Sequence, residues 1–142
     1  MRIFYTKTAF AAIKEHPIAG VGLGQFSAFQ EPFIKARGLH AWANQPVHNM
    51  YMLLASEAGV PALFFFFWFL FSMGQVALRG KSRIAAIRDS LFLFAIFMIA
   101  SFDHFFLTFH QGGLIFWFSL AFFVYTANKD KAFFSEKAKI SI

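Results

Sequence analysis

The chain has 142 residues, of which 58% are hydrophobic and 24 are phenylalanine, with no cysteine and a formal net charge of +6. This length allows one domain, and the apolar share exceeds the roughly 45–50% that is usual in soluble domains. The core of one small domain cannot hold so many phenylalanines, because such a domain exposes much of its surface. The composition excludes a disordered chain, a disulfide-stabilised secreted scaffold and a thiolate metal site. It favours a small all-α membrane protein.

The first 59 residues are predicted to form an outward-facing segment of loops and short amphipathic helices. Residues 3–15 are expected to form a helix that ends before Pro17, because proline disfavours helical geometry in the residue before it. A second helix is expected to begin at Pro46, whose missing N–H costs nothing in the first helical position, and to end at Gly59. The segment between these two helices continues as a polar stretch to Gln45.

A glycine-spaced loop, with glycines at 20, 22 and 24, follows the first predicted helix. A dinucleotide-binding loop needs a preceding strand and a different glycine spacing, and a P-loop needs a lysine followed by serine or threonine. Neither pattern is present. The simpler interpretation is a flexible turn at the membrane surface.

Three apolar segments, 60–78, 90–109 and 111–127, are predicted to cross a membrane, because a spanning helix needs about 20 residues. The link between the first two carries four basic residues, and residues 128–142 form a basic tail with four lysines. The positive-inside rule places both in the cytoplasm and residues 1–59 outside. The basic residues do not form one continuous face, so nucleic acid is not an expected partner.

The pair His48–Asn49 is expected in the first turn of the helix that begins at Pro46. A helix N-terminus suits an anion such as a phosphate, and histidine is the side chain most readily tuned to act as a base near neutral pH. The alternative is an interfacial histidine that caps its own helix. Glu57 lies on the opposite face of an unbroken helix, so it cooperates with His48 only if tertiary packing joins them.

Asp103 and His104 are expected about 20 Å into the second span, counted at 1.5 Å per residue. Ionisable groups at such depth are costly and mark either a function or a buried pairing, so a hydrogen bond to a neighbouring helix is the alternative. With His110 they lack the spacing of a metal site, and no metal is expected. Outward basic residues such as Arg2 and Arg37 suit a phosphate or anionic lipid headgroups.

Several short motifs occur in an order that resembles the O-antigen ligase and polymerase family. They are Arg2 and residues 15–17, 20–26, 48–53, 57–61, 102–104 and 111–112. Members of this family are multi-spanning glycosyltransferases of the bacterial inner membrane, with the catalytic loop facing outward. The resemblance implies transfer of a glycan from an undecaprenyl pyrophosphate-linked donor to a hydroxyl of a glycan or lipid acceptor.

The resemblance also implies roles for individual residues. His48 matches the essential histidine, which is expected to act as a base toward the acceptor hydroxyl, and Arg2 matches an arginine that holds the pyrophosphate. Six further residues are expected to support the site or bind substrate: Asn49, Glu57, Arg37, Asp103, His104 and Gln111. No cofactor or metal is expected, because the lipid carrier is already activated.

Family members have ten or more spans, so the chain resembles their C-terminal portion. We expect activity to require the missing N-terminal half as a partner. The sequence leaves open whether a ligase or a polymerase is the better match. A non-catalytic or degenerate membrane subunit is a second hypothesis, and a small transporter or channel component is a third that the few polar residues in the apolar segments disfavour.

Overall fold

The computed structural model describes the backbone of residues 1–78 and 83–140 and the side chains of residues 1–75 and 87–125. Every regular element in these ranges is helical, which confirms the all-α fold. The elements are α1 (Arg2–Glu15), α2 (Phe26–Ala36), the 3-10 helix η1 (Ala41–Ala43), α3 (Met50–Ala58), α4 (Val60–Leu78), α5 (Arg83–Phe102), α6 (Phe105–Thr108) and α7 (His110–Ile140).

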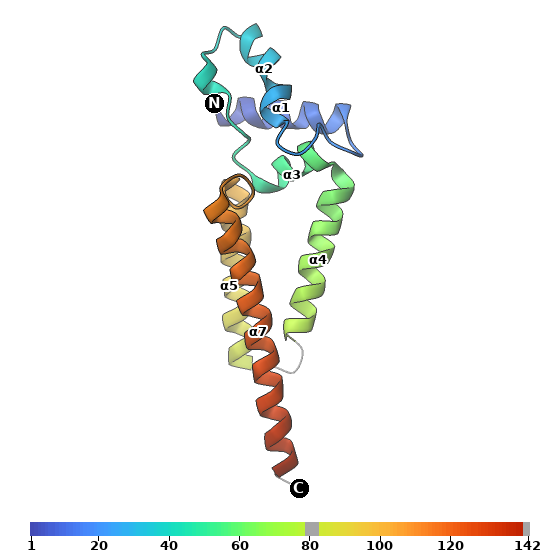
Figure 1. The fold of residues 1–142 in the computed structure, drawn as a ribbon, viewed down its shortest axis with the longest axis vertical. Helices are drawn as coiled ribbons and strands as arrows, with labels where there is room; N and C mark the ends of the chain where they lie inside the picture. Colours follow the sequence, from blue (N-terminus) through green and yellow to red (C-terminus); the bar gives the residue numbers. More distant parts are fainter. Residues whose placement is uncertain (79–82, 141–142) are drawn as a thin grey trace.

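The helices form two parts that differ in direction. Helices α4, α5 and α7 run lengthwise beside one another, and α1, α2 and α3 form a cap across one end of them (Figure 1). Helix α3 connects the two parts, because it packs against α1 on one side and against α4 and α5 on the other. The candidate residues of the cap and those that directly follow α5 therefore meet at this end.

Helix α1 confirms the helix predicted at residues 3–15. It buries one face, which includes Phe4, Tyr5 and Ala9, against Phe26 of α2 and Leu53 of α3. The spacing of these positions in α1 suits one side of a helix with 3.6 residues per turn. Burial of this face holds the cap together, because aromatic side chains contribute the most apolar area of any residues.

The glycine loop is a packed turn, so the prediction of a flexible turn was wrong. The backbone N–H of Val21 donates to the carbonyl of Ser56 at 2.9 Å, and that of Gly22 donates to the carbonyl of Glu57 at 2.9 Å. Gly20 has a φ of +66°, and a Cβ at this position would overlap the backbone of Glu57. The glycines therefore let this loop lie directly against the end of α3.

Two further features of the cap were not predicted. The polar stretch before Gln45 contains α2, which buries Phe26, Gln30 and Ile34 at helical spacing. Helix α3 begins at Met50 and not at Pro46, and it ends before Gly59 as predicted. Buried Gln30 links the parts of the cap, since its side-chain amide donates to the carbonyl of Gln45 at 3.1 Å.

The lengthwise helices bury a second core, which contains Met50, Leu70, Ala100, Phe116 and Leu120. Their outer surfaces expose many large apolar side chains, among them Phe64, Phe65, Trp68, Phe71, Leu91, Phe94, Trp117, Phe118 and Phe122. This surface is far more apolar than the scattered exposed hydrophobic residues of an ordinary soluble domain.

Within the described residues, no helix combines the length and the hydropathy that a membrane crossing requires. The spans predicted at 60–78, 90–109 and 111–127 are therefore not found as such, and the second and third differ from the helices at both ends. Helix α5 ends at Phe102, and α7 begins at His110 and continues through the predicted tail to Ile140. Positions 79–82 and the basic side chains of 128–142 lie outside what the structure describes.

Candidate functional site

Asp103 and His104 lie in a break after α5, so the prediction that they sit within a continuous span was wrong. Helix α5 ends at Phe102, and the Asp103 carboxylate then accepts the backbone N–H of Phe105 at 3.0 Å. Aspartate favours such local bonds to the backbone, which compete with continuation of a helix. The bond sets the start of α6 and leaves Asp103 and His104 between two helices.

His48 lies immediately before α3, in contrast to the prediction that it occupies the first helical turn. Asn49 is the N-cap residue, and its side-chain oxygen accepts the backbone N–H of Met52 at 2.9 Å. The alternative in which His48 caps its own helix is therefore wrong as well. Asparagine is among the preferred N-cap residues, so it fixes where α3 begins.

Asn49 also connects the cap to the break after α5. Its side-chain amide donates to the backbone carbonyl of Ser101 at 2.9 Å. His48 precedes Asn49 by one residue, and Asp103 follows Ser101 by two. One side chain thus holds together the two backbone segments that carry the candidate residues.

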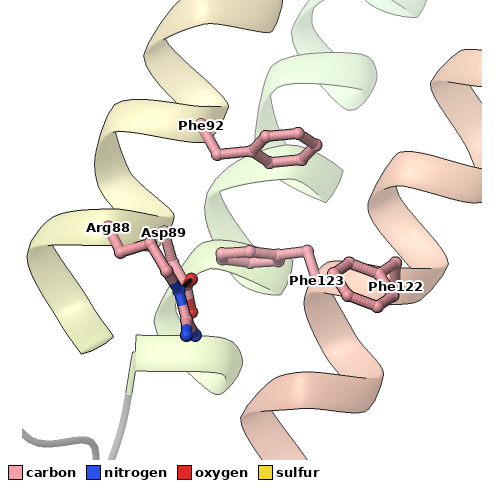
Figure 2. A pocket seen from close by; sticks show the side chains of 5 residues that line it. All are labelled: Arg88, Asp89, Phe92, Phe122 and Phe123. Carbon is pink, nitrogen blue, oxygen red and sulfur yellow. Dashed lines mark hydrogen bonds and ion pairs between the residues drawn. The ribbon is translucent and has the colours of Figure 1, made fainter.

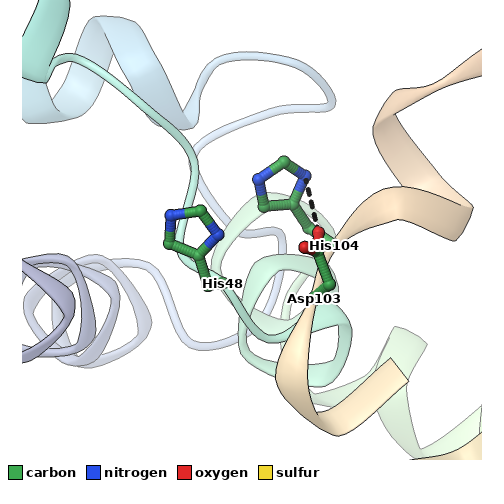
Figure 3. A group of neighbouring side chains, drawn as sticks. All are labelled: His48, Asp103 and His104. Carbon is green, nitrogen blue, oxygen red and sulfur yellow. Dashed lines mark ion pairs between the residues drawn. The ribbon is translucent and has the colours of Figure 1, made fainter. Parts of the chain in front are cut away.

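As a result, His48, Asp103 and His104 face one another across the junction (Figure 3). Each offers one nitrogen or oxygen atom, and these three atoms all lie within 4.8 Å of one another. The two imidazole rings have centroids 5.3 Å apart and planes inclined by 31°. Nδ1 of His104 lies 4.0 Å from Oδ1 of Asp103.

Aromatic rings flank the cluster on two sides. The ring of Tyr5 meets that of His48 edge-on at a centroid distance of 5.8 Å, and the ring of Phe109 stacks on His104 at 6.3 Å. The side chain of His104 is only 9% exposed, whereas that of Asp103 is 49% exposed. The cluster is therefore closed at His104 and open to the surroundings at Asp103.

Hydrogen bonds hold the buried ring of His104 in one orientation. Its Nδ1 lies 2.6 Å from the hydroxyl of Thr108, and that hydroxyl donates to the carbonyl of His104 at 3.2 Å. In the tautomer that carries its proton on Nδ1, the Thr108 oxygen accepts the Nδ1–H, and Nε2 keeps a free lone pair. Burial lowers the pKa of His104, although the nearby Asp103 carboxylate acts in the opposite direction. The lowered pKa favours a neutral ring.

The remaining predicted residues lie apart from this cluster. The Glu57 carboxylate accepts the backbone N–H of Phe26 at 3.3 Å, so it supports the start of α2 and does not partner His48. Arg37 lies over the ring of Phe4 at 4.7 Å, beside a cavity of about 200 Å³. Arg2 is exposed in the first turn of α1, and Gln111 is exposed in the first turn of α7.

A separate pocket of about 210 Å³ lies near the other end of α5, between α5 and α7 (Figure 2). Phenylalanine side chains from both helices line it, together with Arg88 and Asp89. The Arg88 guanidinium contacts the Asp89 carboxylate at 2.7 Å, so their charges compensate each other. The apolar lining and this compensated pair give the pocket no group suited to the predicted chemistry.

A protein-family model described as "O-antigen ligase" matches residues 1–67 of the chain. The predicted resemblance is confirmed for this segment. It covers α1, α2, α3 and the start of α4, and it includes both Arg2 and His48. Comparisons with curated proteins and with solved structures found no match.

The O-antigen ligase match supports a role in O-antigen or related polysaccharide biosynthesis. Asp103 and His104 lie outside the matched segment, although the fold brings them against His48, which lies within it. Reasoning from sequence singled out all three residues but missed their proximity. The sequence signal for this proximity was the Asp103–His104 pair inside an otherwise apolar stretch. Such a pair indicates either a helix break or a buried functional site.

Proposed function

We propose that the chain takes part in glycan transfer as part of an O-antigen ligase-like glycosyltransferase. The donor is a glycan on undecaprenyl pyrophosphate, and the acceptor is a hydroxyl of a second glycan or of a lipid. The partial match to the family, over the segment that carries both Arg2 and His48, supports this reaction class.

The observation that carries the proposal is the position of His48 beside α1. Tyr5 of α1 contacts the ring of His48, and Arg2 lies one helical turn before Tyr5. A base and a cation thus stand on adjacent elements at the same end of the fold. Transfer of a glycan from a pyrophosphate needs both, because a proton is lost at the acceptor and negative charge develops on the leaving group.

In the proposed reaction, the acceptor hydroxyl gives its proton to His48 and its oxygen forms a bond to the anomeric carbon of the donor. The bond between that carbon and the pyrophosphate oxygen breaks, and its electron pair leaves with the lipid pyrophosphate. Arg2 stabilises this anion by charge and by paired N–H donors. Asn49 is a positioning residue, because it fixes the backbone next to His48.

We further propose that the exposed aromatic surface of α4, α5 and α7 contacts membrane lipid or companion helices in a bacterial inner membrane. Many phenylalanine and tryptophan side chains on these helices are exposed, and large exposed apolar surfaces are typical of membrane or protein contact sites. The cap and the cluster at its junction then face outward, where a lipid-linked donor is accessible. Helix α5 ends at Phe102 and α7 begins at His110, so the cluster lies at the end of this region that meets the cap.

Replacement of His48 by alanine tests the proposal in cells that make the chain with its natural partners. We expect His48→Ala to abolish glycan transfer while the protein accumulates at its normal level. His40→Ala is the matched control, since His40 is an exposed histidine of the cap that lies outside the cluster. Transfer is read from the glycan chains on the acceptor in isolated membranes.

Two outcomes contradict the proposal. Full transfer by His48→Ala excludes this histidine as the base. If the wild-type protein is present in the membrane but no glycan transfer depends on it, the result supports a non-catalytic subunit instead.

A further inference from the structure

The cluster at the junction contains the donor set of a metal site. His48 approaches from the segment before α3, whereas Asp103 and His104 approach from the break after α5. Their three candidate donor atoms lie within 4.8 Å of one another. Spacing along the chain conceals this arrangement, because the two histidines come from segments far apart in the sequence.

No hydrogen bond joins the two imidazole rings in the part of the chain that the structure describes. Nδ1 of His104 is in contact with the Thr108 hydroxyl, and in the tautomer with the proton on Nδ1 the Nε2 lone pair is unused. Oδ1 of Asp103 accepts the N–H of Phe105, which leaves its Oδ2 unused. Two imidazoles and a carboxylate therefore converge with acceptor capacity to spare, and an arrangement of this kind is stabilised by a cation.

We propose that His48, Asp103 and His104 bind one divalent transition-metal ion, and that Zn²⁺ fits this donor set best. Imidazole nitrogens suit zinc and its neighbours in the first transition row, whereas Mg²⁺ and Ca²⁺ prefer sites made of oxygen. Three protein ligands leave one tetrahedral position open to water or substrate, as in zinc sites that are not purely structural.

The separation of the donor atoms is close to that of a bound state. Metal–ligand bonds of about 2.0–2.2 Å place tetrahedral ligand atoms about 3.3–3.5 Å apart. No two of the donor atoms are more than 4.8 Å apart, so each pair must move closer by about 1.5 Å at most to bind one ion. Asp103, which is half exposed, and His48, which is partly exposed, have room for this rotation.

Neighbouring residues already hold the ligands as outer partners do in metal sites. A ligating histidine commonly donates its second ring N–H to a fixed acceptor, which orients the ring toward the metal. The Thr108 hydroxyl lies in that position beside Nδ1 of His104. Asn49 fixes the backbone beside His48, because its side-chain amide donates to the carbonyl of Ser101.

Metal binding has a consequence for the reaction, and this part of the inference rests on the proposed function. A zinc-bound imidazole has committed a lone pair to the metal and no longer accepts a proton from the acceptor hydroxyl. Zinc and catalysis thus compete for His48, so the ion inhibits transfer. A chelator then restores transfer and does not abolish it.

Isothermal titration of the full chain in detergent with ZnCl₂ tests the site without any need for activity. We expect one zinc ion per chain for the wild type and for the control His40→Ala. His48→Ala, His104→Ala and Asp103→Asn are each expected to weaken binding by more than about tenfold, since even outer-shell partners of a metal contribute about 10–100-fold. Binding of Co²⁺ with visible absorption of tetrahedral type gives a second readout.

Asp103→Asn keeps the experiment decisive if loss of the buried His104 ring prevents folding. The asparagine carbonyl still accepts the N–H of Phe105, while the negative charge is lost. The inference is overturned if the wild type binds no zinc, or if Asp103→Asn and His48→Ala bind it as tightly as the wild type. Zinc binding without any glycan transfer contradicts the proposed function alone, and transfer by a chain that binds no zinc contradicts the metal site alone.

Discussion

Asn49 provides the most direct test of how the cap is attached to the break after α5. Its side chain accepts the N–H of Met52 as a helix cap and donates to the carbonyl of Ser101, both at 2.9 Å. Loss of an asparagine cap costs about 1 kcal/mol. Loss of a half-buried hydrogen bond costs about a further 1 kcal/mol. We therefore expect Asn49→Ala to lower the free energy of unfolding by about 2 kcal/mol.

Asn49→Ser separates these two contributions. Serine caps helices well but is too short to reach the carbonyl of Ser101, so we expect a loss of about 1 kcal/mol. The assay is denaturing-detergent titration from a mild detergent, followed by the helical circular dichroism signal. Equal stability of Asn49→Ser and the wild type would refute the role of the bond to Ser101, and equal losses in both variants would refute the role of the cap.

Two further predictions concern the glycine loop and the orientation of the chain. Gly20 and Gly24 have φ values of +66° and +71°, so alanine at either position adds about 1–2 kcal/mol of backbone strain. Of these two positions, only Gly20 is so close to Glu57 that a new Cβ would overlap its backbone. Gly20→Ala is therefore expected to lower the unfolding midpoint clearly more than Gly24→Ala. Equal midpoints would contradict the packing of the loop. The chain has no native cysteine, so an impermeant maleimide applied to intact cells is expected to label Leu23→Cys in the exposed loop and not Lys81→Cys in the basic link. The reverse pattern would contradict the proposed orientation.

Local chemistry in the sequence predicted some of the helix ends. The end of α1 before His16 and the end of α3 before Gly59 follow from proline and glycine, which act within one or two residues. The start of α3 was misplaced because Pro46 and Asn49 are both favoured near a helix start. The structure resolves this choice through the bond between Asn49 and Met52, whereas composition alone does not.

Tertiary contacts decided what the sequence could not predict. Helix α2 was missed because its surroundings are polar, and its stability comes from burial of Phe26 and Ile34 against the other helices of the cap. The break at Asp103 was hidden in an apolar stretch whose length suited one continuous span. Likewise, helical periodicity compares only residues within one element, so it could not bring His48 to Asp103.

Chemical rescue measures the central claim, the role of His48 as the base, most directly. Imidazole is added to isolated membranes that contain His48→Ala or Arg2→Ala together with their natural partners, and glycan transfer is followed with and without it. The account predicts that imidazole restores part of the transfer in His48→Ala and none in Arg2→Ala, because only the first variant lacks a proton acceptor. An inactive His48→Ala protein that is normally folded and gains no activity from imidazole would contradict the assigned role.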